Sequence, residues 1–236
     1  MNPNDPNVQM LDIVAERLGD DLCGRLVFVG GAVAGLLITD PAQPAIRPTE
    51  DVDLIAQVIV RTDYYALEGE LRARGFQQDM RAGAPLCRWT VAGVTVDVKP
   101  TLPDVLGFSN RWYPLACATA WAARLPSGRN VQVIAAPAFV ATKLEAFAGR
   151  GHGDYLFSHD LGDITSVVDG RASLLVELEQ ADSELRRGVA NAIGSLLAAR
   201  GFLDSLPGHL PGDAASQERL PDLLLKLRRI AALAGN

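Results

Sequence analysis

Three aspartates have the type and spacing needed to bind a divalent cation. Asp51 and Asp53 stand two positions apart at the start of a stretch that alternates with period two, so both side chains project from one face of a strand. Asp97 lies in a later alternating stretch, on the face opposite to that of the valines. Magnesium prefers carboxylate oxygens and completes its shell with substrate phosphates, and manganese is the alternative ion. The three acids therefore predict a metal site for phosphate chemistry.

A glycine pair precedes these acids. Gly30 and Gly31 follow the apolar run 26–29, which predicts a strand, and precede a dense apolar segment at 32–38, which predicts a short buried helix. A turn without side chains lets phosphate oxygens reach backbone N–H groups, and the helix start adds a positive dipole. A lone glycine pair or a lone pair of aspartates is usually only a turn or a strand end, but the two in this order favour a nucleoside triphosphate site.

The remaining elements must position these residues. Asp63 is a candidate N-cap, and Ala92-Gly93 is a candidate two-residue hairpin turn. The patterns predict a helix around residues 8–18, a proline-rich loop at 41–48, a strand at 51–60, a helix at 63–74, and hairpin strands at 86–91 and 94–99.

The chain changes character after Pro100. A short strand at 131–134 is followed by helical patterns, the first of which has Pro137 in its opening turn. Further helices are expected at 160–169, 173–180, 182–203 and 215–234. We therefore expect an α/β (α+β) catalytic domain at residues 20–110, with a mixed sheet, and a mostly helical C-terminal domain at residues 111–236.

The conjunction of motifs resembles the DNA-polymerase-beta-like nucleotidyltransferase superfamily, in which a glycine pair precedes an Asp-x-Asp strand and a later acidic strand. Within it, the chain is most similar to the AbiEii-type toxins of type IV toxin–antitoxin systems. Their Arg-x-Thr-x-Asp-x-Asp segment appears here as Arg47, Thr49, Asp51 and Asp53. The likeness covers roughly residues 26–170.

A downstream helix carries the rest of the likeness. Lys143 and Arg150 match the family's lysine and arginine, and Asp160 and Asp163 match its later pair of aspartates. His159 stands where family members often have lysine. A second departure is Gly31, which stands where many relatives outside this branch have serine.

The resemblance implies a nucleotidyltransferase fold and transfer of a nucleoside monophosphate to an acceptor hydroxyl, with release of pyrophosphate. Asp51 and Asp53 would hold the metals, and Asp97 would complete the second metal site and act as general base. The nucleotide would contact Gly30, Gly31, Arg47, Thr49, Lys143 and Asp160. Judged without the resemblance, Lys143 would be interpreted as a residue on a solvated helix face, and the acids at 160 and 163 would simply suit a helix start.

The acceptor is a separate question. The toxin resemblance favours RNA, specifically the 3′ end of transfer RNA, and it implies an antitoxin protein as partner. A small molecule such as an aminoglycoside, or a protein hydroxyl, is the alternative, which the net charge of −6 favours. A catalytically silent nucleotide-binding module is a third interpretation. Clustered buried acids argue against it, because they repel one another when no metal offsets their charge.

Composition narrows the class of protein. Its 236 residues are 48% hydrophobic, which is enough for a packed core. We expect a cytoplasmic protein without a membrane span, because long apolar runs and signal-peptide features are lacking. The three cysteines, which are far apart and lie in apolar segments, favour buried thiols over disulfides or a CxxC metal site.

Other candidate residues favour structural roles. The arginines are expected on a solvated face interrupted by acids, the tryptophans in packing, and the histidines on the surface rather than at zinc. These residues are Arg72, Arg74, Arg81 and Arg88; Trp89, Trp112 and Trp121; and His152, His159 and His209.

Overall fold

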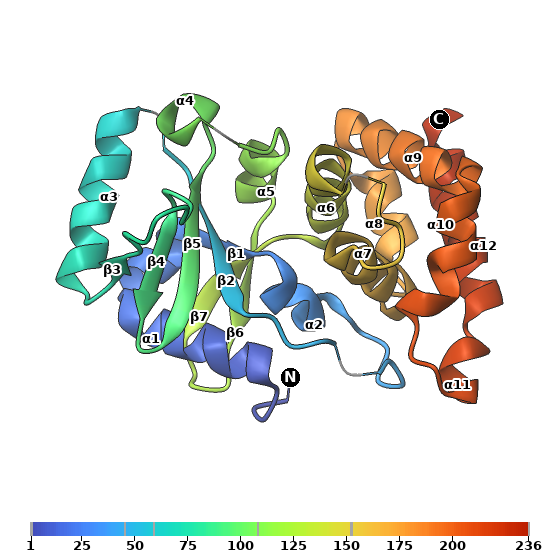
Figure 1. The fold of residues 1–236 in the computed structure, drawn as a ribbon, viewed down its shortest axis with the longest axis horizontal. Helices are drawn as coiled ribbons and strands as arrows, with labels where there is room; N and C mark the ends of the chain where they lie inside the picture. The colour runs from blue at the N-terminus through green and yellow to red at the C-terminus, as the bar shows by residue number, and fades with distance from the viewer. Residues whose placement is uncertain (1, 45, 59, 108, 152, 236) are drawn as a thin grey trace. The chain divides into compact units, whose positions relative to one another are not determined.

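The computed structural model describes residues 2–44, 46–58, 60–107, 109–151 and 153–235. Residue 59, within the strand predicted at 51–60, and His152 lie outside these ranges. The chain forms two compact units (Figure 1). The first comprises residues 1–35 and 47–135, and the second comprises residues 36–46 and 136–236.

The first unit is built on a mixed seven-stranded sheet in the order β3-β4-β5-β2-β1-β7-β6 (Figure 1). β2 pairs antiparallel with β1 and parallel with β5. β1 also pairs with β7 in parallel. The strands are β1 (Leu26–Val29), β2 (Asp51–Ala56), β3 (Gln77–Gln78), β4 (Arg88–Val91), β5 (Val94–Pro100), β6 (Trp121–Arg124) and β7 (Asn130–Val133).

The boundary between the two units differs from the one expected at residue 110. β6 and β7 extend the sheet beyond β1, so the first unit continues to Ala135. Residues before 20 also belong to this unit, because α1 (Pro6–Arg25) packs against β1, β2, β5 and β7. The catalytic domain that we expected at 20–110 therefore stops short of the first unit at both ends and includes residues 36–46, which belong to the second unit.

Two predicted boundaries shift for local reasons. The strand expected at 51–60 ends at Ala56, which lies opposite Pro100, and proline has no N–H to continue the ladder. The helix expected from Asp63 begins at Arg61 as α3 (Arg61–Ala73). Asp63 is then inside the first turn, where its carboxylate accepts a hydrogen bond from the N–H of Val60 at 3.1 Å.

The second unit is helical, as expected for the C-terminal region. Its helices are α6 (Ala136–Arg150), α7 (His159–Gly170), α8 (Leu174–Gln180), α9 (Ser183–Ala198), α10 (Arg200–Ser205), α11 (Ala214–Gln217) and α12 (Leu220–Ala232). The helix expected at 182–203 is divided by the extended backbone of Ala199. The one expected at 215–234 is divided before α12, whose first turn contains Pro221. Within the described ranges, no helix has the length and apolar content needed to cross a membrane.

The remaining helices are short. The first unit contains α4 (Pro103–Leu106) and α5 (Tyr113–Ala118). The segment after the glycine pair is a 3-10 turn (Gly31–Val33) followed by α2 (Ala34–Leu37), which is shorter than the helix predicted at 32–38. A phosphate at this turn would thus depend on its backbone N–H groups more than on a helix dipole.

Candidate metal centre

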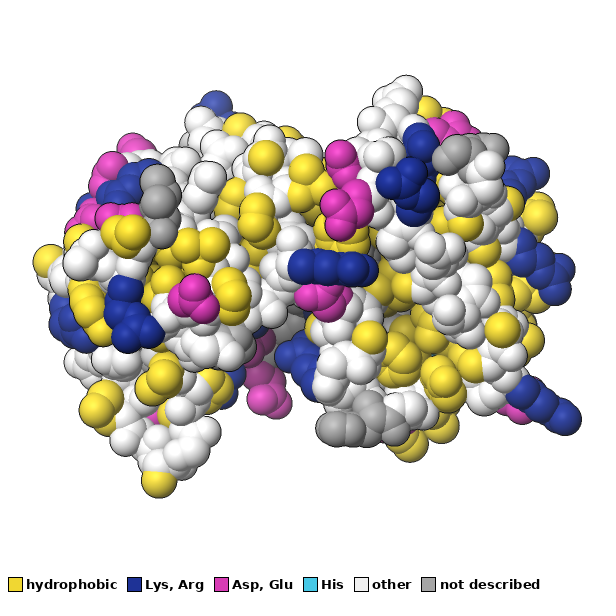
Figure 2. All heavy atoms as spheres, turned by 90° about the horizontal axis from the view of Figure 1, so that it is seen from above, with side chains coloured by type: hydrophobic (Ala, Val, Ile, Leu, Met, Phe, Trp, Pro, Cys, Tyr) yellow, Lys and Arg dark blue, Asp and Glu magenta, His cyan; other side chains and the backbone are white. Residues whose placement is uncertain are grey.

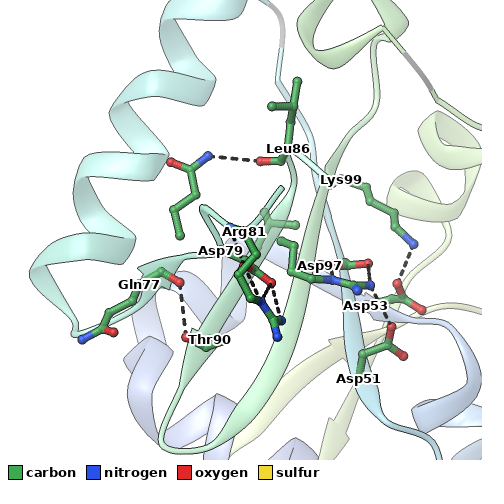
Figure 3. Close-up of polar contacts among 12 residues, drawn as sticks. Asp51, Asp53, Gln77, Asp79, Arg81, Leu86, Thr90, Asp97 and Lys99 are labelled. Atoms are coloured by element: carbon green, nitrogen blue, oxygen red, sulfur yellow. Dashed lines mark hydrogen bonds and ion pairs between the residues drawn. The ribbon is translucent and has the colours of Figure 1, made fainter. Parts of the chain in front are cut away.

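Strand register brings the three aspartates together. Asp53 on β2 lies opposite Asp97 on the parallel strand β5, and Asp51 is two residues before Asp53. Each residue has a carboxylate oxygen within 4.8 Å of one from the other two. Figure 3 shows the three side chains converging on one side of the sheet. They form the one cluster of three or more acids, histidines or cysteines that could hold a metal among the residues described.

The glycine turn lies directly against this cluster. Val29, the last residue of β1, pairs with Asp53, and Gly30 follows with a φ of 72° and a ψ of −169°. Only glycine adopts this backbone conformation readily. A Cβ at residue 30 would lie 1.9 Å from Oδ2 of Asp53. The turn therefore packs directly against the carboxylate of Asp53 and leaves no room for a side chain at residue 30.

Two side-chain cations already contact the acids. Arg88 on β4 donates two hydrogen bonds to Asp97, at 2.8 and 2.9 Å, and its guanidinium lies 3.6 Å from Asp51. Lys99 on β5 lies with its Nζ 2.5 Å from Oδ1 of Asp53 (Figure 3). Two of the three negative charges are thus offset within the first unit itself.

Arg88 is partly exposed, with 29% of its side chain accessible, but the prediction of a solvated face did not include its contact with the acidic cluster. The two-residue turn at Ala92-Gly93 sets a hairpin register in which residue 88 faces residue 97, so this pair could have been found from the sequence. The other three arginines also form ion pairs with acids. Arg72 pairs with Glu68, Arg74 with Glu70 and Asp21, and Arg81 with Asp79.

The surroundings alter the protonation of the cluster. Burial raises the pKa of Asp51, and the neighbouring charges of Asp53 and Asp97 raise it further. For Lys99, burial alone would lower the pKa, but the attraction of Asp53, Tyr113 and Asp97 and the hydrogen bond to Asp53 together outweigh it, and the pKa is raised. A cation bound among these acids would relieve the repulsion at Asp51. The donor set consists only of carboxylate oxygens, so it fits magnesium or manganese.

Arg47 and Thr49 lie in the segment that leads into β2, and hydrogen bonds hold this segment in place. The side chain of Asn7, buried in α1, donates to the carbonyl of Arg47 at 3.1 Å and accepts from the N–H of Thr49 at 2.8 Å. The Thr49 hydroxyl donates to the carbonyl of Asp51 at 3.1 Å. Asn7, which sequence reasoning missed, therefore fixes the entry to the acidic strand. Its position in the first turn of a helix carried no signal of this role.

Lys143 belongs to the second unit, where it is buried. Its residue is 9% exposed, and its Nζ lies 2.6 Å from Asp163 and 3.2 Å from Asp160. Arg150 also contacts Asp160, at 2.9 Å. Burial acts to raise the pKa of Asp160, but hydrogen bonds from Arg150 and the charge of Lys143 reverse the effect and lower it. The interpretation of Lys143 as a solvated helix residue is therefore wrong.

The remaining candidates have mixed environments. Trp89 and Trp112 are buried, as expected, whereas Trp121 on the edge strand β6 is 41% exposed and does not belong to the core. His159 is exposed at the start of α7. His209 is partly buried, with Nε2 2.7 Å from the carbonyl oxygen of Tyr155.

No model of a known protein family matches the chain, and no curated protein matches it in sequence.

Proposed function

We propose that this chain is a metal-dependent nucleotidyltransferase with a nucleotidyltransferase fold, which moves a nucleoside monophosphate from a nucleoside triphosphate to an acceptor hydroxyl. One observation carries the proposal. Three carboxylates from adjacent strands converge within 4.8 Å, beside a glycine turn whose backbone abuts one of them. An acidic cluster beside a glycine turn suits a metal ion and the phosphates that complete its shell.

Each residue has a proposed role. Asp51 and Asp53 would hold magnesium or manganese, and Asp97 would complete the second metal site and accept the proton of the acceptor hydroxyl. When bound, the metal would supply charge stabilisation at the transferring phosphate. Gly30 and Gly31 would direct N–H groups toward phosphate oxygens. The contact of Lys143 and Asp160 with the nucleotide rests on the family resemblance alone.

The proposed acceptor is the 3′ end of transfer RNA, with an antitoxin protein as partner, in the cytoplasm. The proposals for the acceptor and for the antitoxin partner rest on the toxin resemblance. The net charge of −6 keeps a small molecule or a protein hydroxyl as the alternative acceptor. On the face viewed in Figure 2, Lys and Arg side chains are scattered singly or beside acids, which supports the alternative for that face.

A silent nucleotide-binding module is the second candidate function. The clustered acids argue against it less than the sequence suggested, because Arg88 and Lys99 offset part of the repulsion without a metal. An enzyme and a silent module therefore differ in turnover rather than in the presence of the acids.

Metal and nucleotide binding can be tested by thermal unfolding. Magnesium and a nucleoside triphosphate together should raise the melting temperature more than the sum of their separate effects, because each completes the coordination of the other. Asp53→Asn should abolish this synergy, whereas Asp79→Asn, at an acid of the same unit outside the cluster, should retain it. Equal synergy in wild type and Asp53→Asn would remove Asp53 from the site.

Turnover separates the two candidates. Each labelled nucleoside triphosphate is incubated with magnesium and with total RNA, total protein or an aminoglycoside. Label in one acceptor fraction, lost in Asp53→Asn, supports the enzyme and identifies the acceptor class. Synergistic binding without transfer to any fraction would favour the silent module.

A further inference from the structure

Both carboxylate oxygens of Asp53 are closely approached by other groups of the first unit. Oδ1 lies 2.5 Å from Nζ of Lys99. Oδ2 faces Gly30 so closely that a Cβ there would be 1.9 Å away. The Lys99 side chain is 18% exposed, so its ammonium is largely enclosed at this contact. A divalent cation that binds Oδ1 of Asp53 would therefore compete with this ammonium, whose contact with Asp53 is drawn in Figure 3.

Lys99 and Arg88 hold their acids in different ways. Arg88 binds Asp97 through two parallel hydrogen bonds from a planar guanidinium, and strand pairing sets the two residues opposite each other. Lys99 donates to a single oxygen of Asp53, from a compact charge at the end of a flexible stem. A metal ion can therefore replace the lysine contact more easily than the arginine contact, because fewer hydrogen bonds with fixed directions are broken.

We propose that Lys99 is an exchangeable counter-ion of the acidic cluster, which holds Asp53 when no divalent cation is bound and leaves it when one binds. This inference rests on the proposed metal site. Lys99 thus stabilises the cluster without metal and competes with metal for one ligand, so that it sets the metal concentration at which the site fills.

Wild-type protein offers the first test. The sequence has three lysines, Lys99, Lys143 and Lys226, so each can be followed by mass spectrometry after brief acetylation. Addition of Mn²⁺ should increase the labelling rate of Lys99 severalfold, because its amine leaves an enclosed ion pair, while the rate at Lys226 stays constant. Calorimetry on the same samples reports whether Mn²⁺ binds.

Substitution gives the second test. Lys99→Met keeps most of the stem and removes the charge. It should bind Mn²⁺ on the order of tenfold more tightly, because a competing positive charge within ion-pairing distance is gone. Without metal, the melting temperature of Lys99→Met should be a few degrees below that of wild type. Mn²⁺ should raise the melting temperature of this variant more than that of wild type. Lys226→Met, which removes a lysine of the second unit that lies near Asp169, should leave Mn²⁺ affinity unchanged.

The outcomes distinguish the inference from the proposed function. If Mn²⁺ binds to wild type while Lys99 labelling stays constant or falls, the exchange is wrong and the metal site stands. Unchanged or weaker Mn²⁺ affinity in folded Lys99→Met would also overturn it. If wild type binds no Mn²⁺, the proposed metal site fails and the inference fails with it.

Discussion

The carboxylate of Asp53 fills the space that a side chain at Gly30 would need, since a Cβ on residue 30 would lie 1.9 Å from Oδ2 of Asp53. The two residues meet where β1 ends beside β2. The turn that would direct N–H groups at phosphate is thereby packed onto an acid that would hold the metal. A change at Gly30 should therefore affect the proposed phosphate-binding turn and the proposed metal ligand Asp53 together.

Gly30→Ala should damage both the fold and the site. The backbone conformation of residue 30 is restricted to glycine, so alanine should lower the free energy of unfolding by about 1–3 kcal/mol. The new methyl group should also push the Asp53 carboxylate away and abolish magnesium–nucleotide synergy in thermal unfolding.

Gly69→Ala is the matched control. Gly69 lies in α3, where a Cβ would meet no atom within 4 Å, and helical backbone accepts alanine. This variant should gain about 0.5–1 kcal/mol of stability and keep the synergy. Retained synergy in Gly30→Ala would show that the turn and Asp53 do not act together.

Local patterns predicted the parts of the site that depend on strand geometry. Period-two alternation identified the face shared by Asp51 and Asp53 and the polar face of Asp97, and the structure joins these faces through the register of β2 and β5. Lys99 is two residues after Asp97 on β5, so the same alternation puts it on the face of Asp97. The two-residue turn also sets the register that puts Arg88 opposite Asp97, although the acids that interrupt the arginines had favoured a solvated face.

Contacts between distant segments could not be predicted in this way. Asn7 bonds to residues 40 and 42 positions away, and no periodic pattern encodes that distance. Burial of Lys143 depends on how α6 and α7 pack, because its charge is tolerated only beside Asp160 and Asp163. Residues 36–46 join the second unit through contacts with Gly170 and Arg219, which likewise required the tertiary structure.

Asp160 should make the stability of the protein depend on acid pH. Its pKa is lowered in the folded state, so its contribution is full above the ordinary value near 3.8 and is lost as pH falls through the lower folded pKa. Asp160→Asn should cost about 1–3 kcal/mol at neutral pH. The difference from wild type, followed by circular dichroism in denaturant, should shrink at pH values below the ordinary one.

An exposed acid of the same unit serves as the comparison. Asp204 lies 3.6 Å from Arg200, and both side chains are exposed. Asp204→Asn should change stability little at any pH. A constant difference between wild type and Asp160→Asn across the acid range would contradict the assigned ion pairs.

Arg219 should hold residues 36–46 within the second unit. Its guanidinium donates to Asp169 and Asp40, both at 2.7 Å, and to Gln43 at 2.9 Å. Arg219→Ala should therefore cost about 1–3 kcal/mol and increase proteolytic cleavage within 36–46. Arg219→Lys should recover only part of this, because an ammonium cannot reproduce the planar fork. Arg200→Ala, at an exposed arginine, should match wild type, and equal cleavage in all variants would exclude the role.

Lys143 requires a test that separates stability from nucleotide contact. Lys143→Ala removes an ammonium 2.6 Å from Asp163, whose side chain is 2% exposed, so it should cost about 3–5 kcal/mol. Arg150→Ala, at an arginine that is 68% exposed, should cost no more than about 1 kcal/mol. Loss of labelling in Lys143→Ala would thus not by itself show a role at phosphate.

The pair Lys143→Met with Asp163→Leu resolves the ambiguity. Replacing a buried ion pair with apolar residues of similar volume is often neutral, so the double variant should recover most of the stability lost in Lys143→Ala. Asp160 keeps its contact with Arg150 in this background. If Lys143 neutralises charge on the transferring triphosphate, turnover in the refolded double variant should remain on the order of a hundredfold below wild type. Turnover that returns together with stability would mean that Lys143 serves only the helical unit, and that the resemblance to the toxin family extends no further than the acids of the sheet.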